Sequence, residues 1–198
     1  MTNTNGRSTP RPVDPLFLDR WSPRAYSGEP IDAYDLMTIL DAAHWAPSAS
    51  NNQPWRFVYG VKVTAAFDSL LSILVPGNQR LAKDAGALVF VISQTETEAT
   101  AEHAARPIPT HSFDAGAAWM ALALQAQLFG FHAHGMAGLD YDKARELLSV
   151  PEGFKVEMAL ALGKPGRVED LPEDLQAREK PSHRKPLETL AFEGKLGG

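Results

Sequence analysis

The chain has 198 residues, 44% apolar and 22% charged side chains, a formal net charge of −5 and no cysteine. This length and composition favour one domain with a substantial core. The negative charge disfavours nonspecific binding to nucleic acid or to anionic membranes. The absence of cysteine excludes disulfides, thiolate catalysis and thiolate metal ligands. It also suits a reducing compartment, so we expect a cytoplasmic protein.

The first residues, 1–14, form a polar arm rich in Thr, Asn, Pro and Arg. The arm has no apolar run, so we do not expect a secretory signal peptide there. We expect it to be disordered or to lie along a partner subunit. Residues 15–198 are then expected to form a single domain.

A short basic segment, Arg20-Trp21-Ser22-Pro23-Arg24, lies near the start of this domain. It combines two guanidinium groups with a hydroxyl, while Trp21 and Pro23 restrict the backbone. A planar guanidinium donates paired hydrogen bonds to phosphate and keeps its charge. The segment is therefore a candidate phosphate site. The alternative is a basic turn at the surface.

A helix is expected over residues 32–45, with Asp32 as its N-cap and with apolar residues at helical spacing. Pro47 ends it. From there to Pro54 the chain carries only small or amide side chains: Ser48, Ala49, Ser50, Asn51, Asn52 and Gln53. Short hydroxyl and carboxamide groups suit the polar edge of a flat heteroaromatic ligand. A solvated turn is the alternative.

The middle of the chain alternates strands and helices. Strands are expected over residues 55–59 and 87–92, and the second is an unbroken apolar run typical of a strand buried on both faces. Apolar residues at helical spacing over 63–74 predict a helix between them. The Val-Pro-Gly-Asn sequence at 75–78 is expected to end that helix.

Two contrasting segments follow. Residues 94–111 are polar and contain prolines, so we expect a mobile cover with a short helix around 98–104. Residues 112–129 predict a long helix capped by Ser112 that carries no Lys, Arg or Glu. Such a helix is expected to be buried on every face, in the core or at a subunit interface. Its apolar part is shorter than the ~20 residues of a membrane span.

The last regular elements complete an α+β pattern. A short strand is expected over residues 132–136, a helix over 141–148 with Asp140 as its cap, and an alternating strand over 156–163. The tail is acidic and Pro-rich before it becomes basic. Strands and helices mix along the chain, so the expected architecture is one sheet flanked by helices.

Several familiar sites are absent from the sequence. It contains no P-loop, no Gly-x-Gly-x-x-Gly after a strand, no His-Glu-x-x-His and no Gly-x-Ser-x-Gly. His132 and His134 would share a strand face, but no third ligand has suitable spacing. We therefore expect no metal site, and we expect these histidines to hydrogen-bond in the core or near a cofactor.

Taken in order, the polar segments resemble the FMN-dependent nitroreductase family. The matching features are residues 20–24, residues 46–57, Asn78, the Ala-rich helix after Phe113, the loop at 135–140 and the basic segment at 183–188. They span nearly the whole chain after its first dozen residues. The resemblance implies a nitroreductase-like fold, with one mixed, mostly antiparallel sheet flanked by helices and a long buried helix at a dimer interface.

The resemblance also implies a tightly bound, non-covalent FMN. The implied contacts are Arg20, Trp21, Ser22, Arg24, Pro47, Ser48, Ala49, Asn51, Asn78, Gly135, Ala137, Gly138 and Arg184. Arg20, Ser22 and Arg184 would hold the phosphate. Arg24 would face the N1–O2 edge of the ring and Asn78 the pyrimidine edge, while the glycine-rich loop would run near N5. By the same resemblance the protein is a homodimer, and the segment around Asn51 reaches the partner's flavin.

Two positions depart from relatives in that family. Ala137 stands where some relatives have a carboxylate, so the resemblance does not carry over any substrate contact that depends on an acid there. Leu81 stands where some relatives have a lysine, so the positive charge near N1 and O2 would depend on Arg24.

The function implied is an oxidoreductase that uses NAD(P)H as co-substrate. By a ping-pong reaction, hydride would pass through flavin N5 to an electron-poor small molecule: a nitroaromatic, a quinone or an activated carbonyl. This chemistry needs no acid–base side chain, so no catalytic residue is expected. The alternatives are a flavin-fragmenting or dehalogenating enzyme of the same fold, or a flavin-binding protein without turnover.

Overall fold

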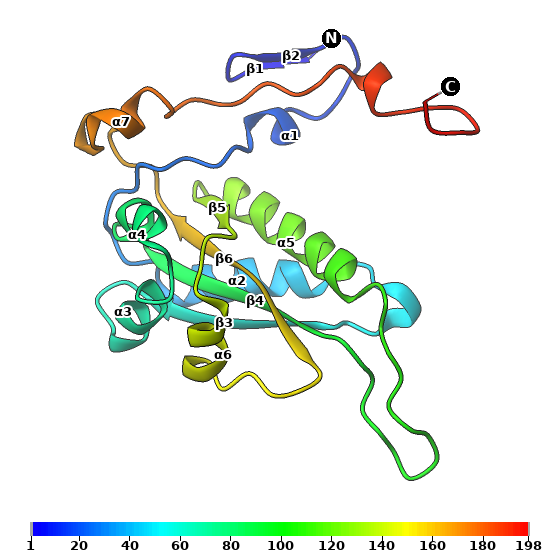
Figure 1. Ribbon diagram of the computed structural model, residues 1–198. Coiled ribbons are helices and arrows are strands. Elements are labelled where there is room, and N and C mark those ends of the chain that lie inside the picture. Colours follow the sequence, from blue (N-terminus) through cyan, green and yellow to red (C-terminus); the bar gives the residue numbers. More distant parts are fainter. Residues whose placement is uncertain (1, 198) are drawn as a thin grey trace.

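A four-stranded antiparallel sheet forms the centre of the computed structural model, which describes residues 2–197. Its strands are β3 (Trp55–Val61), β4 (Ala87–Gln94), β6 (Phe154–Gly163) and β5 (His132–Met136), in that spatial order (Figure 1). Every neighbouring pair is antiparallel. The expected α+β class is confirmed, and within this chain the sheet contains no parallel pair among the described strands.

Strand β4 is buried along its whole length, as its unbroken apolar run predicts. Successive side chains point to opposite faces of a sheet. Val89 and Val91 therefore join one hydrophobic core, and Leu88 and Phe90 join the other. The sheet is thus a middle layer between two layers of helices.

Helices α2 (Ala33–His44) and α5 (His111–Leu128) cover the first face. The Asp32 carboxylate accepts a hydrogen bond from the N–H of Asp35, which confirms the predicted cap. The predicted start of α5 is wrong by one residue and its cap by two. The helix follows Thr110, because the Ser112 hydroxyl donates to Glu157 instead of capping the helix.

Helices α3 (Ala65–Leu71), α4 (Pro76–Ala82) and α6 (Tyr141–Leu147) cover the second face. The Pro-Gly pair does not end a helix, as we expected, but opens α4. Proline fits the first turn of a helix, where its missing N–H costs no intrahelical hydrogen bond. The predicted Asp140 cap of α6 is confirmed by its bond with the N–H of Lys143.

The two chain ends lie above α5, away from the sheet (Figure 1). The N-terminal residues form a hairpin of β1 (Thr2–Thr4) and β2 (Arg7–Thr9), and the short helix α1 (Pro15–Asp19) follows. The C-terminal part contains η2 (Val168–Asp170), α7 (Glu173–Gln176) and η3 (Leu187–Thr189). In this chain the arm is a hairpin, and its packing on a partner subunit stays a prediction.

Within the single chain, α5 is buried on one side only, which differs from the expectation of burial on all faces. Ala118 and Leu122 are fully buried, whereas Phe113 is 80% exposed and Leu128 is 64% exposed. The exposed side is apolar, so one chain leaves this helix incompletely covered. Within the described residues, no helix is both long and apolar enough to cross a membrane.

The segment between β4 and α5 forms an irregular projecting loop (Figure 1). The short helix predicted around residues 98–104 is absent from this described segment. Instead, the Thr100 hydroxyl accepts hydrogen bonds from the N–H groups of Glu102 and His103, which makes a tight turn. Glu96 and Pro107 pair across the stem of the loop.

Candidate functional site

A cavity of about 460 Å³ lies between the segment after α1 and the C-terminal segment after α7. Five arginines and Lys180 contribute to its lining. The predicted residues Arg20, Trp21, Ser22, Arg24 and Arg184 all lie here, although Arg184 is far from the others in sequence. The structure therefore brings both chain ends to one cationic cavity.

Strand β5 supports the base of this cavity. The Trp21 ring packs edge-to-face on His132, with ring centroids 6.2 Å apart. His134 Nδ1 is 2.7 Å from the Pro23 carbonyl oxygen. Burial lowers the pKa of both histidines, and the charge of Arg20 lowers the pKa of His132 further. Both shifts favour the neutral imidazole. His132 serves as a packing group for Trp21, and His134 hydrogen-bonds to the backbone of Pro23.

Glu179 is a site residue that the sequence analysis missed. Its carboxylate accepts hydrogen bonds from the backbone N–H groups of Arg24, at 2.8 and 2.9 Å, and Ala25, at 2.9 Å. The Arg24 guanidinium also donates to the Arg178 carbonyl at 2.8 Å. A lone acid between Arg178 and Lys180 was the available sequence signal. Glu179 therefore holds the backbone at Arg24 and Ala25 against the C-terminal segment.

The charge in the cavity is poorly balanced by protein groups. Arg20 Nη1 lies 3.4 Å from Ser22 Oγ, and Arg184 Nη1 donates to Ser182 Oγ at 3.0 Å. Within residues 2–197, no carboxylate lies at ion-pair distance from Arg20 or Arg184. Burial lowers the pKa of Arg20, and the charges of Arg184 and Arg7 lower it further. This donor set is suited to an anion such as phosphate.

A second group of predicted residues meets where α4 contacts the loop after β5. Asn78 Nδ2 donates to the Gly138 carbonyl oxygen at 2.9 Å. A Cβ atom on Gly138 would lie 2.7 Å from that same Nδ2, so a larger residue here would displace the Asn78 side chain. Arg80 forms an ion pair with Asp174 at 2.8 Å, which ties α4 to the C-terminal segment.

The remaining loop positions are more open. At Gly135 a Cβ atom would make only ordinary contacts with Trp119 and Met158. Ala137 is exposed, and its carbonyl accepts a hydrogen bond from the Tyr141 hydroxyl at 3.3 Å. Leu81 is 7% exposed and belongs to the core.

The amide-rich segment lies apart from the cationic cavity. Ser50, Asn51 and Gln53 have positive φ angles of 50°, 54° and 47°, so the 3₁₀ turn η1 (Ala49–Asn51) leads into a strongly bent loop. Ser48 Oγ accepts from the Gln53 N–H at 2.9 Å and helps to fix the bend. Left-handed backbone is uncommon without glycine and often marks functional loops.

This loop is fixed at the N-terminal end of α5 (Figure 1). The buried Asp114 carboxylate accepts hydrogen bonds from the Ala49 N–H at 3.3 Å and from the Thr110 hydroxyl at 2.9 Å. None of the predicted contacts Pro47, Ser48, Ala49 and Asn51 lines the cavity of its own chain. Within one chain the predicted contacts therefore lie in three places: the cationic cavity, the contact between Asn78 and Gly138, and this loop.

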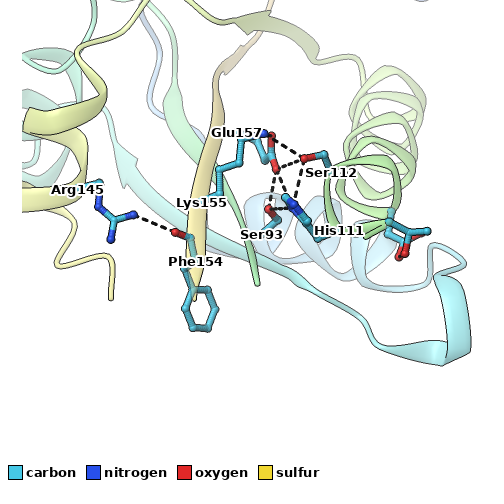
Figure 2. A network of polar contacts seen from close by, with 9 residues as sticks. Ser93, His111, Ser112, Arg145, Phe154, Lys155 and Glu157 are labelled. Atoms are coloured by element: carbon cyan, nitrogen blue, oxygen red, sulfur yellow. Dashed lines mark hydrogen bonds and ion pairs between the residues drawn. The ribbon is translucent and has the colours of Figure 1, made fainter. Parts of the chain in front are cut away.

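Figure 2 shows a polar network at the base of the projecting loop. Glu157 Oε1 accepts hydrogen bonds from the Ser93 and Ser112 hydroxyls, each at 2.6 Å, and Lys155 Nζ lies 2.9 Å from Oε2. Ser93 Oγ is also 2.8 Å from His111 Nδ1. Burial raises the pKa of Glu157, but the hydrogen bonds from Ser112, Ser93 and Lys155 hold it below its ordinary value. The network fastens both ends of the loop to β6.

No group of three potential metal ligands occurs among residues 2–197. The pair His132 and His134 is instead used in packing beside the cavity.

Comparison with known proteins identifies the family. A family model described as "Nitroreductase family" matches residues 18–164. An uncharacterized 15.4 kDa protein of Mycolicibacterium smegmatis is 35% identical over 133 residues, covering 66% of this chain and 84% of the relative. An NADH dehydrogenase of Thermus thermophilus is 26% identical, over 88% and 92% of the two chains.

Solved structures agree with this assignment. A crystal structure described as an oxidoreductase containing FMN is 55% identical, covers 100% of both chains and superposes with a TM-score of 0.97. A protein from Desulfovibrio desulfuricans in complex with FMN is 25% identical over 95% and 99% of the chains, with a TM-score of 0.70. The fold and these matches define an oxidoreductase. The chain belongs to the nitroreductase family.

Proposed function

We propose that the protein is an FMN-dependent oxidoreductase that takes electrons from NAD(P)H and reduces electron-poor small molecules. The observation that carries this proposal is the cationic cavity, where Arg20, Ser22 and Arg184 converge without a carboxylate partner among the described residues. Two similar structures are described with FMN, which supports the same cofactor here.

The residues present fit FMN. Guanidinium and hydroxyl groups of the cavity would hold its phosphate, since both donate to anionic oxygens. The Glu179 carboxylate is hydrogen-bonded to backbone N–H groups and lies 3.7 Å from the Arg24 guanidinium, which offsets its negative charge in part. Its contacts orient Arg24, whose positive charge would favour an anionic, reduced ring edge. When bound, FMN supplies the hydride chemistry at N5.

The physical separation of the cationic cavity and the Asn51 loop supports a homodimer. The Asn51 loop projects from the α5 N-terminus, away from the cationic cavity of its own chain. The apolar, exposed side of α5 offers a surface on which a second chain would be buried. We propose that each loop completes the partner's flavin site and that the dimer acts in the cytoplasm.

An anaerobic titration tests the proposed activity. NADH or NADPH should bleach the flavin absorbance, and a nitroaromatic or a quinone should then restore it. A flavin that neither nucleotide bleaches would contradict the reductase and favour a flavin-binding protein without turnover. Loss of intact FMN during turnover would indicate the flavin-fragmenting enzyme. Release of halide from a halogenated aromatic would indicate the dehalogenating enzyme.

A further inference from the structure

The N-terminal hairpin places one arginine in a buried junction. Asn5 and Gly6 connect its strands with φ angles of 52° and 69°. An Asn-Gly pair with two positive φ angles is typical of a two-residue hairpin turn. The turn sets Arg7 opposite Thr4. Among residues 2–20, all of which the structure describes, Arg7 alone is buried.

The Arg7 guanidinium joins the hairpin to both segments that line the cationic cavity. Its Nε donates to the Ser182 carbonyl at 2.9 Å. Its Nη1 donates to the carbonyls of Leu18, at 2.7 Å, and Arg20, at 2.8 Å. Ser182 lies two residues before Arg184. Arg7 therefore contacts the backbone on both sides of the candidate phosphate site, and it also lines the cavity.

These contacts balance the charge of Arg7 only in part. The three acceptors are neutral carbonyls, and within residues 2–197 no carboxylate forms an ion pair with Arg7. Burial lowers the pKa of Arg7 and the positive charge of Arg184 lowers it further, while the negative charge of Asp19 raises it in part. Gathering like charges in a part-buried place costs free energy unless an anion binds there.

We propose that Arg7 is a third guanidinium of the flavin phosphate site and that it also positions Arg20 through the Arg20 carbonyl. Nε and Nη1 donate to backbone carbonyls, so Nη2 is the nitrogen that would donate to an anion. The hairpin lies outside residues 18–164, which match the family model, so the family comparison does not cover Arg7. It rests on the proposed function, because the anion is taken to be the phosphate of FMN.

Riboflavin, which lacks only the phosphate of FMN, provides the test. We expect Arg7→Gln to weaken FMN binding to the flavin-free protein by about 10- to 100-fold, as for the loss of one charge-assisted contact. Riboflavin binding should stay nearly unchanged. Arg7→Lys keeps the charge and should retain most of the preference for FMN. Arg11→Gln removes the same charge from an exposed position of the same arm and is the matched control.

Each result is decisive. If Arg7→Gln weakens the binding of FMN and riboflavin equally, or changes the binding of neither, Arg7 has only a structural role and the proposal is wrong. If Arg7→Gln does not fold, Arg7→Lys decides: loss of its preference for FMN over riboflavin overturns a role for the charge. If wild-type protein binds riboflavin as tightly as FMN, the inference fails although a flavin site survives. If it binds neither, the proposed function fails as well.

Discussion

The carboxylate of Glu179 accepts two close contacts from the backbone N–H of Arg24 and lies 3.7 Å from the guanidinium of the same residue. The Glu179 side chain is only 3% exposed. One acid near the C-terminus thus fixes both the backbone and the side chain of an arginine near the N-terminus. Together with the hydrogen bonds of Arg7 and of the Arg24 guanidinium, this contact holds the two chain ends together around the cationic cavity.

Glu179→Ala should destabilise the protein and weaken FMN binding. The substitution leaves the part-buried N–H groups of Arg24 and Ala25 without their acceptor, which costs at most about 1–3 kcal/mol for each group. Urea unfolding measures the free energy, and flavin titration measures the affinity. Glu173→Ala, at an exposed position of α7, is the control and should change neither. Unchanged stability in Glu179→Ala would contradict the role of this carboxylate.

Arg20→Ala and Arg24→Ala should affect different properties of the flavin. Loss of Arg20 should lower the affinity for FMN by about 10- to 100-fold, or roughly 1.5–3 kcal/mol, because a phosphate contact acts on affinity. Loss of Arg24 should make the flavin potential more negative, because a positive charge beside N1 stabilises the reduced ring. Titration and potentiometry of both variants separate the two roles, and equal effects on both observables would refute the division.

Much of the fold could be predicted because its signals are local. The unbroken apolar run of β4 and the caps at Asp32 and Asp140 depend on neighbouring residues only. The predicted element boundaries were wrong where a residue distant in sequence bonds to a side chain that was expected to act locally. Ser112 has the form of a helix cap, but Glu157 from β6 takes its hydroxyl. The Pro-Gly sequence at 76–77 is compatible with both a helix end and a helix start.

The candidate site could also be predicted in part, because some of its residues form a local sequence pattern. Arg20, Ser22 and Arg24 form a local pattern, and Arg184 was added by resemblance to a family. Glu179 and Arg7 were missed, because their importance comes from contacts with residues far away in sequence or with backbone carbonyls. No periodicity or spacing encodes such a contact.

The Glu157 network should make stability depend on pH in the acid range. The pKa of Glu157 in the folded protein lies below its ordinary value of 4.5, so the unfolded chain binds its proton first as the pH falls. The stabilisation is therefore complete above about pH 4.5, and it is lost as the pH falls through the lower, folded value. Unfolding curves of wild type and Glu157→Gln should differ most near neutral pH and converge in acid.

The exposed residue Glu152 provides the control for this measurement. Glu152→Gln should follow the wild-type dependence on pH. A difference between wild type and Glu157→Gln that stays constant from neutral pH into strong acid would show that the charge of Glu157 does not carry the stabilisation.

A shared site predicts complementation between inactive chains. Arg20→Ala damages the cationic half of a site, and Asn51→Ala damages the loop contributed by the partner. A mixed dimer then holds one intact site and one site with both lesions, so activity should recover partly after subunit exchange. Sedimentation gives the oligomeric state. A stable, FMN-loaded monomer, or exchange without recovery, would refute the shared-site model while leaving the flavin assignment intact.

The central claim is that the cationic cavity between the chain ends holds the phosphate of FMN, and the chromophore released from purified protein tests it most directly. Mass spectrometry and absorbance should identify FMN, at about one molecule per chain, and Arg20→Ala prepared in the same way should retain much less. Release of FAD, no flavin after attempted reconstitution, or equal FMN retention by wild type and Arg20→Ala would contradict the account.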